Sequence, residues 1–116
     1  MGVTGIGGFF FRARDPEALA GWYAEHLGVG LGDYGVWDQQ AGPTVFSPYE
    51  ASSDQIPAGK DWKLNFRVDA LDAMKAALAA GGIEVITNPD WDAPGVGRFA
   101  QVHDPEGNLI ELWEPD

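Results

Sequence analysis

Apolar positions at helical spacing follow a strand-length apolar run near the start of the chain. Residues 9–13 form the apolar run and predict a buried strand. Asp15, Pro16 and Glu17 then supply a helix N-cap, a proline for the first helical position and an acidic first turn. The apolar face of the expected helix consists of Leu19, Trp22, Tyr23 and Leu27. Gly28 stands where a C-cap is expected, so the pattern predicts a helix that ends at Leu27.

The next segment lacks any long periodic pattern. Residues 29–49 contain short strand-like pieces separated by turn-forming residues. These breaks are Gly30, Gly32, Gly35, Gly42 and Pro43. A polar stretch from residue 50 to residue 61 has the composition of a linker.

The second half of the chain repeats the order of strand, helix and further strands. Residues 63–68 predict a strand, Asp69 is the expected cap of a second helix, and Gly81-Gly82 ends it. The apolar stripe of this helix is Leu71, Met74 and Leu78. Three more strands are expected over residues 83–86, 98–103 and 109–114, with a turn at residues 104–108 joining the last two.

An internal repeat follows from this order of elements. Aligning the two halves places Phe11-Arg12 on Phe66-Arg67 and the first helix on the second. We therefore expect one domain over residues 1–116, built from a first module at about 5–50, a linker at about 51–60 and a second module at about 61–116.

Composition and charge narrow the class of protein. The 116 residues are 45% hydrophobic and 22% charged, which is a globular balance for a single domain. The net charge of −11 disfavours binding to nucleic acid or to anionic membrane surfaces. With no cysteine, no bilayer-length apolar run and no basic leader, the sequence predicts a cytoplasmic protein.

Three segments together carry a family resemblance. FFFRARDPEALAGWYAEHLGV, NFRVDALDAM and GRFAQVHDPEGNLIELWEP resemble the glyoxalase/bleomycin-resistance/extradiol-dioxygenase superfamily, also called vicinal oxygen chelate proteins. The DPEGN turn followed by IELWEP is the most specific of these motifs. The resemblance implies an α+β fold in which two paired βαβββ modules form an incomplete, curved mixed β-barrel around a cavity. It also implies a homodimer.

The resemblance further implies four positions that usually hold a divalent metal. They correspond here to Gly8, Phe46, Lys63 and Glu111. Glycine and phenylalanine offer no donor atom, and a protonated lysine repels a cation. We therefore expect no metal and no other cofactor. A metal held by His103 and Glu111 is the alternative, although these residues lie two cross-strand steps apart in the expected hairpin.

Glu111 is the candidate catalytic or ligand-binding carboxylate. Strand alternation places it with Leu109 and Trp113 on one face, while Ile110 and Leu112 occupy the other. A carboxylate facing a cavity must find a partner or take up a proton. The alternative is an exposed glutamate at the end of a strand.

Basic and aromatic side chains are expected on the same face as Glu111. Lys63, Asn65 and Arg67 alternate onto one face of their strand, and Lys63 is expected to pair with Glu111 in place of the metal. The alternative is that these bases pair with surface acids. The complete set of expected ligand-binding residues is Phe10, Arg12, Phe46, Lys63, Asn65, Arg67, Phe99, Gln101, His103 and Trp113.

Two functions are compatible with these features. The first is binding of a small molecule through an incomplete metal site, as in the drug-sequestering resistance proteins of the superfamily. The second is a glyoxalase-like lyase or isomerase in which Glu111 acts as a base on a carbonyl substrate. The missing metal ligands favour the first.

Overall fold

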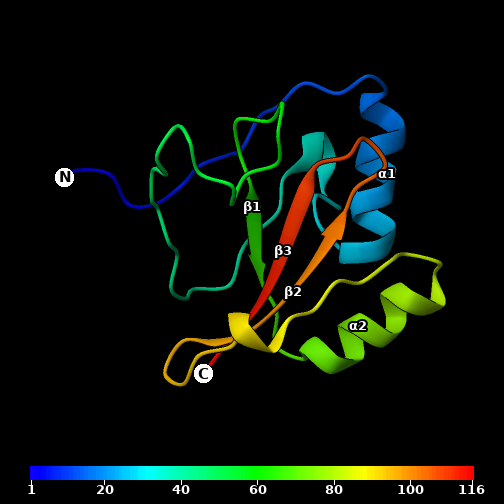
Figure 1. The fold of residues 1–116 in the computed structure, drawn as a ribbon. Coiled ribbons are helices and arrows are strands. Elements are labelled where there is room, and N and C mark those ends of the chain that lie inside the picture. Colours follow the sequence, from blue (N-terminus) through cyan, green and yellow to red (C-terminus); the bar gives the residue numbers. More distant parts are fainter.

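A three-stranded mixed sheet lies at the centre of the fold. The computed structural model describes residues 1–116 and has an α+β architecture with two helices beside the sheet (Figure 1). The strands are β1 (Leu64–Arg67), β2 (Gly97–His103) and β3 (Leu109–Pro115), and the helices are α1 (Pro16–Leu27) and α2 (Leu71–Ala80). Short 3-10 turns η1 (Asp33–Gly35) and η2 (Pro89–Trp91) complete the elements. Neither helix is long and apolar enough to cross a membrane.

β3 is the central strand and sets the positions of its neighbours. It pairs in parallel with β1 and antiparallel with β2, giving the order β1-β3-β2. In this register Glu111 lies opposite Asn65 on one side and opposite Gln101 on the other. Partners directly opposite each other project to the same face of a sheet.

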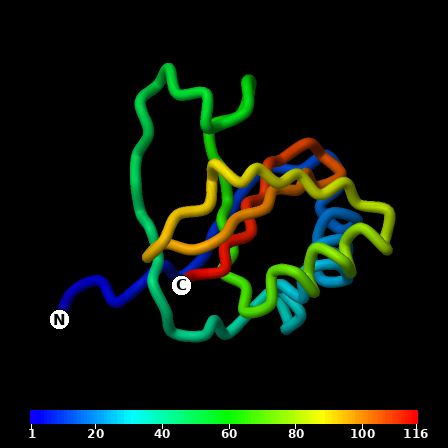
Figure 2. Tube along the Cα trace, turned by 60° about the horizontal axis from the view of Figure 1, so that its bottom comes forward, coloured from blue at the N-terminus to red at the C-terminus, as the bar shows by residue number.

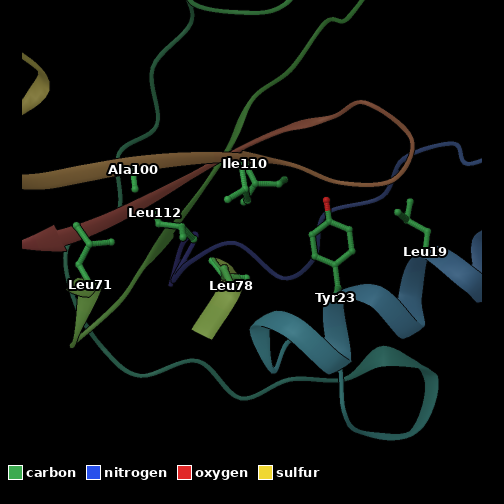
Figure 3. Packing of buried hydrophobic residues seen from close by; sticks show 8 residues of the cluster. Leu19, Tyr23, Leu71, Leu78, Ala100, Ile110 and Leu112 are labelled. Atoms are coloured by element: carbon green, nitrogen blue, oxygen red, sulfur yellow. The ribbon is translucent and has the colours of Figure 1, made fainter. Parts of the chain in front are cut away.

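The core lies between the sheet and the two helices, which cover one face (Figure 3). Its buried residues are Leu19 and Tyr23 of α1, Leu71 and Leu78 of α2, and Ala100, Val102, Ile110 and Leu112 of the sheet. Truncating a fully buried leucine such as Leu112 to alanine costs about 2–5 kcal/mol. The opposite face of the sheet is therefore free to carry polar side chains.

The two helices begin in different ways. The Asp15 side chain accepts a hydrogen bond from the Ala18 N–H, and Gly28 ends α1 in the left-handed region at φ 67°, which confirms both predicted caps. The predicted Asp69 cap of α2 is wrong, because the residue before the helix is Ala70 and no side chain there caps it. A Glu114 carboxylate oxygen accepts from the Leu71 N–H at 2.8 Å, so the end of β3 caps α2 instead.

The turn between β2 and β3 is built around a buried carboxylate. Tyr23 Oη donates to Asp104 Oδ2 at 2.6 Å, and Asn108 Nδ2 donates to the same oxygen at 2.8 Å. The N–H groups of Glu106 and Asn108 donate to Asp104 Oδ1. Burial and the neighbouring carboxylate raise the pKa of Tyr23 well above its ordinary value. This network confirms the predicted turn and fixes it to α1.

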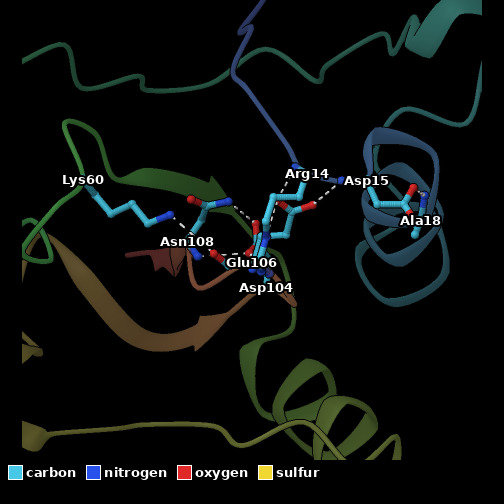
Figure 4. A network of polar contacts seen from close by, with 7 residues as sticks. All are labelled: Arg14, Asp15, Ala18, Lys60, Asp104, Glu106 and Asn108. Atoms are coloured by element: carbon cyan, nitrogen blue, oxygen red, sulfur yellow. Dashed lines mark hydrogen bonds and ion pairs between the residues drawn. The ribbon is translucent and has the colours of Figure 1, made fainter.

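Glu106 connects the same turn to the N-terminal side of α1 (Figure 4). Its carboxylate accepts from the N–H of Arg14 at 2.6 Å and from the N–H of Asp15 at 3.1 Å. These two backbone hydrogen bonds lower the pKa of Glu106. Its carbonyl oxygen also accepts from Lys60 Nζ at 3.4 Å. Glu106 thus ties two segments to one hairpin turn, namely the residues just before α1 and the residues before β1.

The strands expected in the first half do not form. Residues 9–13 are not in a strand, and the prediction there is wrong, because no neighbouring strand pairs with this apolar run. Residues 29–49 contain no strand either, and residues 83–86 contribute a single bridge from Ile86 to Gln101. Figure 2 shows the chain from about residue 30 to residue 60 arching away from the helices.

These segments, which form no strand, make the molecule less compact than a typical globular chain of its length. The radius of gyration is 14.7 Å, against about 13.4 Å for a compact chain of this length. One chain shows a single open sheet formed by its second half, so paired modules and a barrel stay predictions.

Candidate functional site

A polar cluster occupies the face of the sheet opposite the helices. Asn65 Nδ2 donates to Glu111 Oε1 at 2.8 Å, and Gln101 Nε2 donates to Glu111 Oε2 at 3.4 Å. Lys63 Nζ lies 3.8 Å from Oε2 of the same carboxylate. The Lys63 side chain is 9% exposed and that of Glu111 is 16% exposed, so most of the ion pair is shielded from bulk water. Three predicted residues thus surround Glu111 as expected from strand alternation.

An aromatic pair extends this cluster along β2 and β3. The rings of Phe99 and Trp113 are stacked with centroids 6.2 Å apart and planes 4° apart. Trp113 Nε1 donates to the Val96 carbonyl at 2.9 Å, and an Asp92 carboxylate oxygen accepts from the Phe99 N–H at 3.1 Å. The Trp113 ring is therefore held by a hydrogen bond from outside the cluster, and the Phe99 ring stacks on it, which places an aromatic surface on the same face as the carboxylate and amide groups.

Tyr49 is a site residue that the sequence patterns did not indicate. Lys63 Nζ lies 5.2 Å from the centroid of its ring, within the range of a cation–π interaction. Tyr49 comes just before the polar stretch expected to be a linker, and nothing in its spacing marks it as a partner of β1. Lys63 is thus held between a carboxylate and an aromatic ring.

The Arg67 guanidinium makes its hydrogen bonds within the chain. Its guanidinium donates to the carbonyl oxygens of Gln40 and Pro43 and to Thr44 Oγ1. These donors are therefore already committed to the chain itself. Arg67 lies on the same strand as Asn65, but its guanidinium holds residues 40–44 and is not an unpaired cation.

Three other expected ligand-binding residues lie outside the cluster. Phe10 is 93% exposed and Phe46 is 89% exposed, and Arg12 is also exposed. The reason is that the strands expected around residues 9–13 and 29–49 do not form, so nothing carries these side chains to the sheet. Their role in binding a ligand stays a prediction.

His103 lies at the end of β2, opposite Leu109 and not opposite Glu111. The side chain paired with Glu111 from β2 is that of Gln101. The residue is exposed and borders a pocket of about 330 Å³ that Trp22 and Ile83 also line. The alternative of a metal shared by His103 and Glu111 gains no support from this arrangement.

The donor set does not fit a divalent metal. Of the four positions that the family resemblance implies, Gly8 and Phe46 carry no donor atom. Lys63 places an ammonium beside the one carboxylate, Glu111. No three histidine, aspartate or glutamate side chains lie close enough together to hold an ion. The cluster can instead offer hydrogen-bond donors, an acceptor and a stacking surface to an organic molecule.

Comparison with a protein-family model supports the resemblance in the sequence. The model of the glyoxalase-like domain matches residues 8–113. It thus covers the polar cluster and both helices.

Curated relatives match part of the chain. One is "Putative glyoxylase CFP32" from Mycobacterium tuberculosis, 44% identical over 54 residues, or 47% of this chain and 20% of the relative. Another is the anthracycline biosynthesis protein DnrV from Streptomyces peucetius, 35% identical over 66 residues, or 57% of this chain and 24% of the relative. The chain thus spans about a fifth to a quarter of the length of these relatives.

Solved structures match over nearly the whole chain. TnmS3, an antibiotic binding protein from Streptomyces sp. CB03234, is 28% identical with a TM-score of 0.64, over 100% of this chain and 99% of that one. A glyoxalase/bleomycin resistance protein from the same organism is 29% identical with a TM-score of 0.53, over 86% of this chain and 91% of that one. The likeness to TnmS3 therefore includes the first half of the chain.

Proposed function

The chain belongs to the glyoxalase-like domain family, and we propose that it binds a planar small molecule without a metal ion. The observation that carries this proposal is the Lys63–Glu111 pair, which lies 3.8 Å apart where the family would place metal ligands. The ammonium supplies beside Glu111 the positive charge that an ion would otherwise supply.

The geometry favours a ligand with an aromatic body and hydrogen-bonding groups at its edge. The parallel rings of Phe99 and Trp113 present apolar surface. The amides of Asn65 and Gln101 and the Glu111 carboxylate offer donors and acceptors next to that surface. Since Glu111 already has a partner of opposite charge in Lys63, the ligand need not be a cation.

Three comparisons support a sequestering role. TnmS3 is an antibiotic binding protein, and a second similar structure is a glyoxalase/bleomycin resistance protein. DnrV is named for anthracycline biosynthesis. We therefore propose that this chain encloses an antibiotic-like aromatic molecule, in the manner of a resistance protein. The cytoplasmic location expected from the composition is part of this proposal.

We propose that the binding form is a homodimer with the paired modules of the family. The first half of one chain leaves large apolar side chains exposed, and a second copy would cover them. Those in this half are Met1, Val3, Ile6, Phe9, Phe10, Phe11, Leu31, Tyr34, Val36, Trp37, Val45, Phe46 and Tyr49. Light scattering that gives only the 12.5 kDa monomer at micromolar concentration would contradict the dimer.

Alizarin, a planar dihydroxyanthraquinone, tests the binding function directly. The wild-type protein, freed of metal with a chelator, is expected to bind alizarin saturably, as followed by the quinone absorbance. Glu111→Gln removes a charged acceptor and is expected to weaken binding about tenfold. Glu17→Gln, an exposed change on α1, is the matched control. Absent binding, or binding restored only by a stoichiometric metal, contradicts the proposal.

A glyoxalase-type lyase or isomerase is the second candidate, because Glu111 is a carboxylate shielded from water and one relative carries a glyoxylase name. In that case Glu111 would remove a proton next to a substrate carbonyl. Incorporation of solvent deuterium into the thiol adduct of a 2-oxoaldehyde, abolished by Glu111→Gln, would favour this function over sequestration.

A further inference from the structure

Residues 37–49 pass beside the polar face of the sheet without joining it. We call this segment the strap. None of its N–H or carbonyl groups pairs with another backbone group, and all of its residues are exposed. Figure 2 shows this part of the chain as an arch that stands apart from the helices. Its position must therefore depend on side-chain contacts.

Those contacts are few and come from β1 and from Lys63, the residue before it. Arg67 donates to Gln40 O at 2.7 Å and to Thr44 Oγ1 at 3.1 Å, and it also donates to the Pro43 carbonyl. At one end of the strap, the Trp37 ring meets the Phe66 ring edge-on at 6.0 Å. At the other end, Tyr49 lies over the Lys63 ammonium. Arg67 thus supplies every hydrogen bond that the sheet makes to the middle of the strap.

The strap also borders the candidate ligand site. Lys63, which Tyr49 covers, is the partner of Glu111, and its side chain is 9% exposed. Arg67 lies on the same face of β1 as Asn65, because it follows Asn65 by two residues, and Lys63 precedes Asn65 by the same interval just before the strand. A change in the position of the strap would therefore change access to the Lys63–Glu111 pair.

We propose that Arg67 is a positioning residue that holds the strap beside the polar face and so sets access to Lys63 and Glu111. The proposed control of ligand access rests on the proposed binding function. The clamp itself does not, because it concerns contacts within the chain.

The chemistry of the clamp requires a guanidinium. The planar fork of arginine presents several N–H donors in fixed directions, whereas a lysine ammonium is a compact point charge. Gly42 fits against this group, since a Cβ on it would lie 2.9 Å from Arg67 Nε. Arg67→Lys would therefore keep the charge but lose the simultaneous contacts with residues 40, 43 and 44.

Limited proteolysis and lysine acylation test the clamp without any ligand. In Arg67→Lys, thermolysin is expected to cut within residues 37–49 several times faster than in the wild type, while cutting within β3 is unchanged. Lys63 is expected to react several times faster with an N-hydroxysuccinimide ester, measured by mass spectrometry relative to Lys75 of the same chain. Arg14→Lys is the matched control, because the Arg14 side chain is 83% exposed.

The outcomes separate the clamp from the binding function. Unchanged proteolysis of the strap and unchanged Lys63 reactivity in a folded Arg67→Lys protein would overturn the proposal. If the strap loosens but wild-type protein does not bind alizarin, the clamp stands and the proposed function fails. If alizarin binds equally well to both proteins although the strap has loosened, the clamp holds the strap but does not control access, and the proposal is overturned in that part.

Discussion

Lys63 Nζ lies 3.8 Å from Glu111 Oε2, although Lys63 directly precedes the edge strand β1 and Glu111 lies in the central strand β3. Their side chains share a face because β1 and β3 run in parallel with Asn65 opposite Glu111. The pair is therefore a consequence of register, and it contains most of the charge that the polar face offers a ligand.

Removing one member of this pair is expected to cost more than removing both. Lys63→Met leaves Glu111 with only amide donors, and we expect a loss of about 1–3 kcal/mol, because the pair is shielded but not fully buried. Lys63→Met combined with Glu111→Gln is expected to recover part of that loss. Urea unfolding of the four proteins in a double-mutant cycle measures the coupling. Additive effects would show that the two charges do not interact.

The phenol of Tyr23 is expected to stabilise the protein through Asp104. Tyr23→Phe removes a 2.6 Å hydrogen bond in a buried network and should cost about 1–3 kcal/mol, because the carboxylate retains its other donors. Thermal unfolding measures the loss. Tyr34→Phe is the control, since the Tyr34 side chain is fully exposed. Equal melting temperatures for Tyr23→Phe and the wild type would mean that the turn is not anchored to α1 by this bond.

Glu106 is expected to make stability fall in acid. Hydrogen bonds from the Arg14 and Asp15 N–H groups lower its pKa in the folded protein below the ordinary 4.5. The unfolded chain therefore binds a proton first as pH falls, so the contribution of Glu106 is present above about 4.5 and is lost as pH drops through the folded pKa. Melting temperatures measured from neutral pH to about pH 3 should decline less steeply for Glu106→Gln. Identical slopes would contradict this assignment.

The sequence predicted the three strands of the sheet, both helices and most of the polar cluster, but it also predicted a strand at residues 83–86 that forms only one bridge. Alternation in β1 and β3 was enough to place Lys63, Asn65 and Glu111 on one face, because a strand with two different faces has only one register that buries its apolar side chains. The caps of α1 were equally local, since Asp15 and Gly28 act within one turn of the helix.

What the sequence could not predict depends on contacts between distant segments. The apolar run at residues 9–13 has strand composition, but a strand also needs a neighbour, and no local pattern shows whether one is present. The clamp of Arg67 on residues 40–44 and the contact of Tyr49 with Lys63 join segments of different character. Periodicity within one segment contains no information about such pairs.

Gly97 is expected to be the glycine least tolerant of substitution at the ligand site. It begins β2 at φ 136°, and a Cβ there would lie 2.1 Å from the Glu114 carbonyl oxygen and 2.8 Å from Trp113 Nε1. Gly97→Ala therefore combines backbone strain with a clash against fixed backbone, and we expect a cost of about 3 kcal/mol or more. It should also displace the Trp113 indole from the Val96 carbonyl, changing the near-ultraviolet circular dichroism.

Gly95→Ala is the matched control, because Gly95 also has positive φ, at 80°, but its Cβ would meet open space. Both variants carry the cost of a positive φ, so a larger loss of melting temperature in Gly97→Ala reports the clash together with a φ that lies farther from the left-handed region. If the two melt together, the Gly97 backbone can move away from β3, and the aromatic wall of the site is less rigid than its stacked rings indicate.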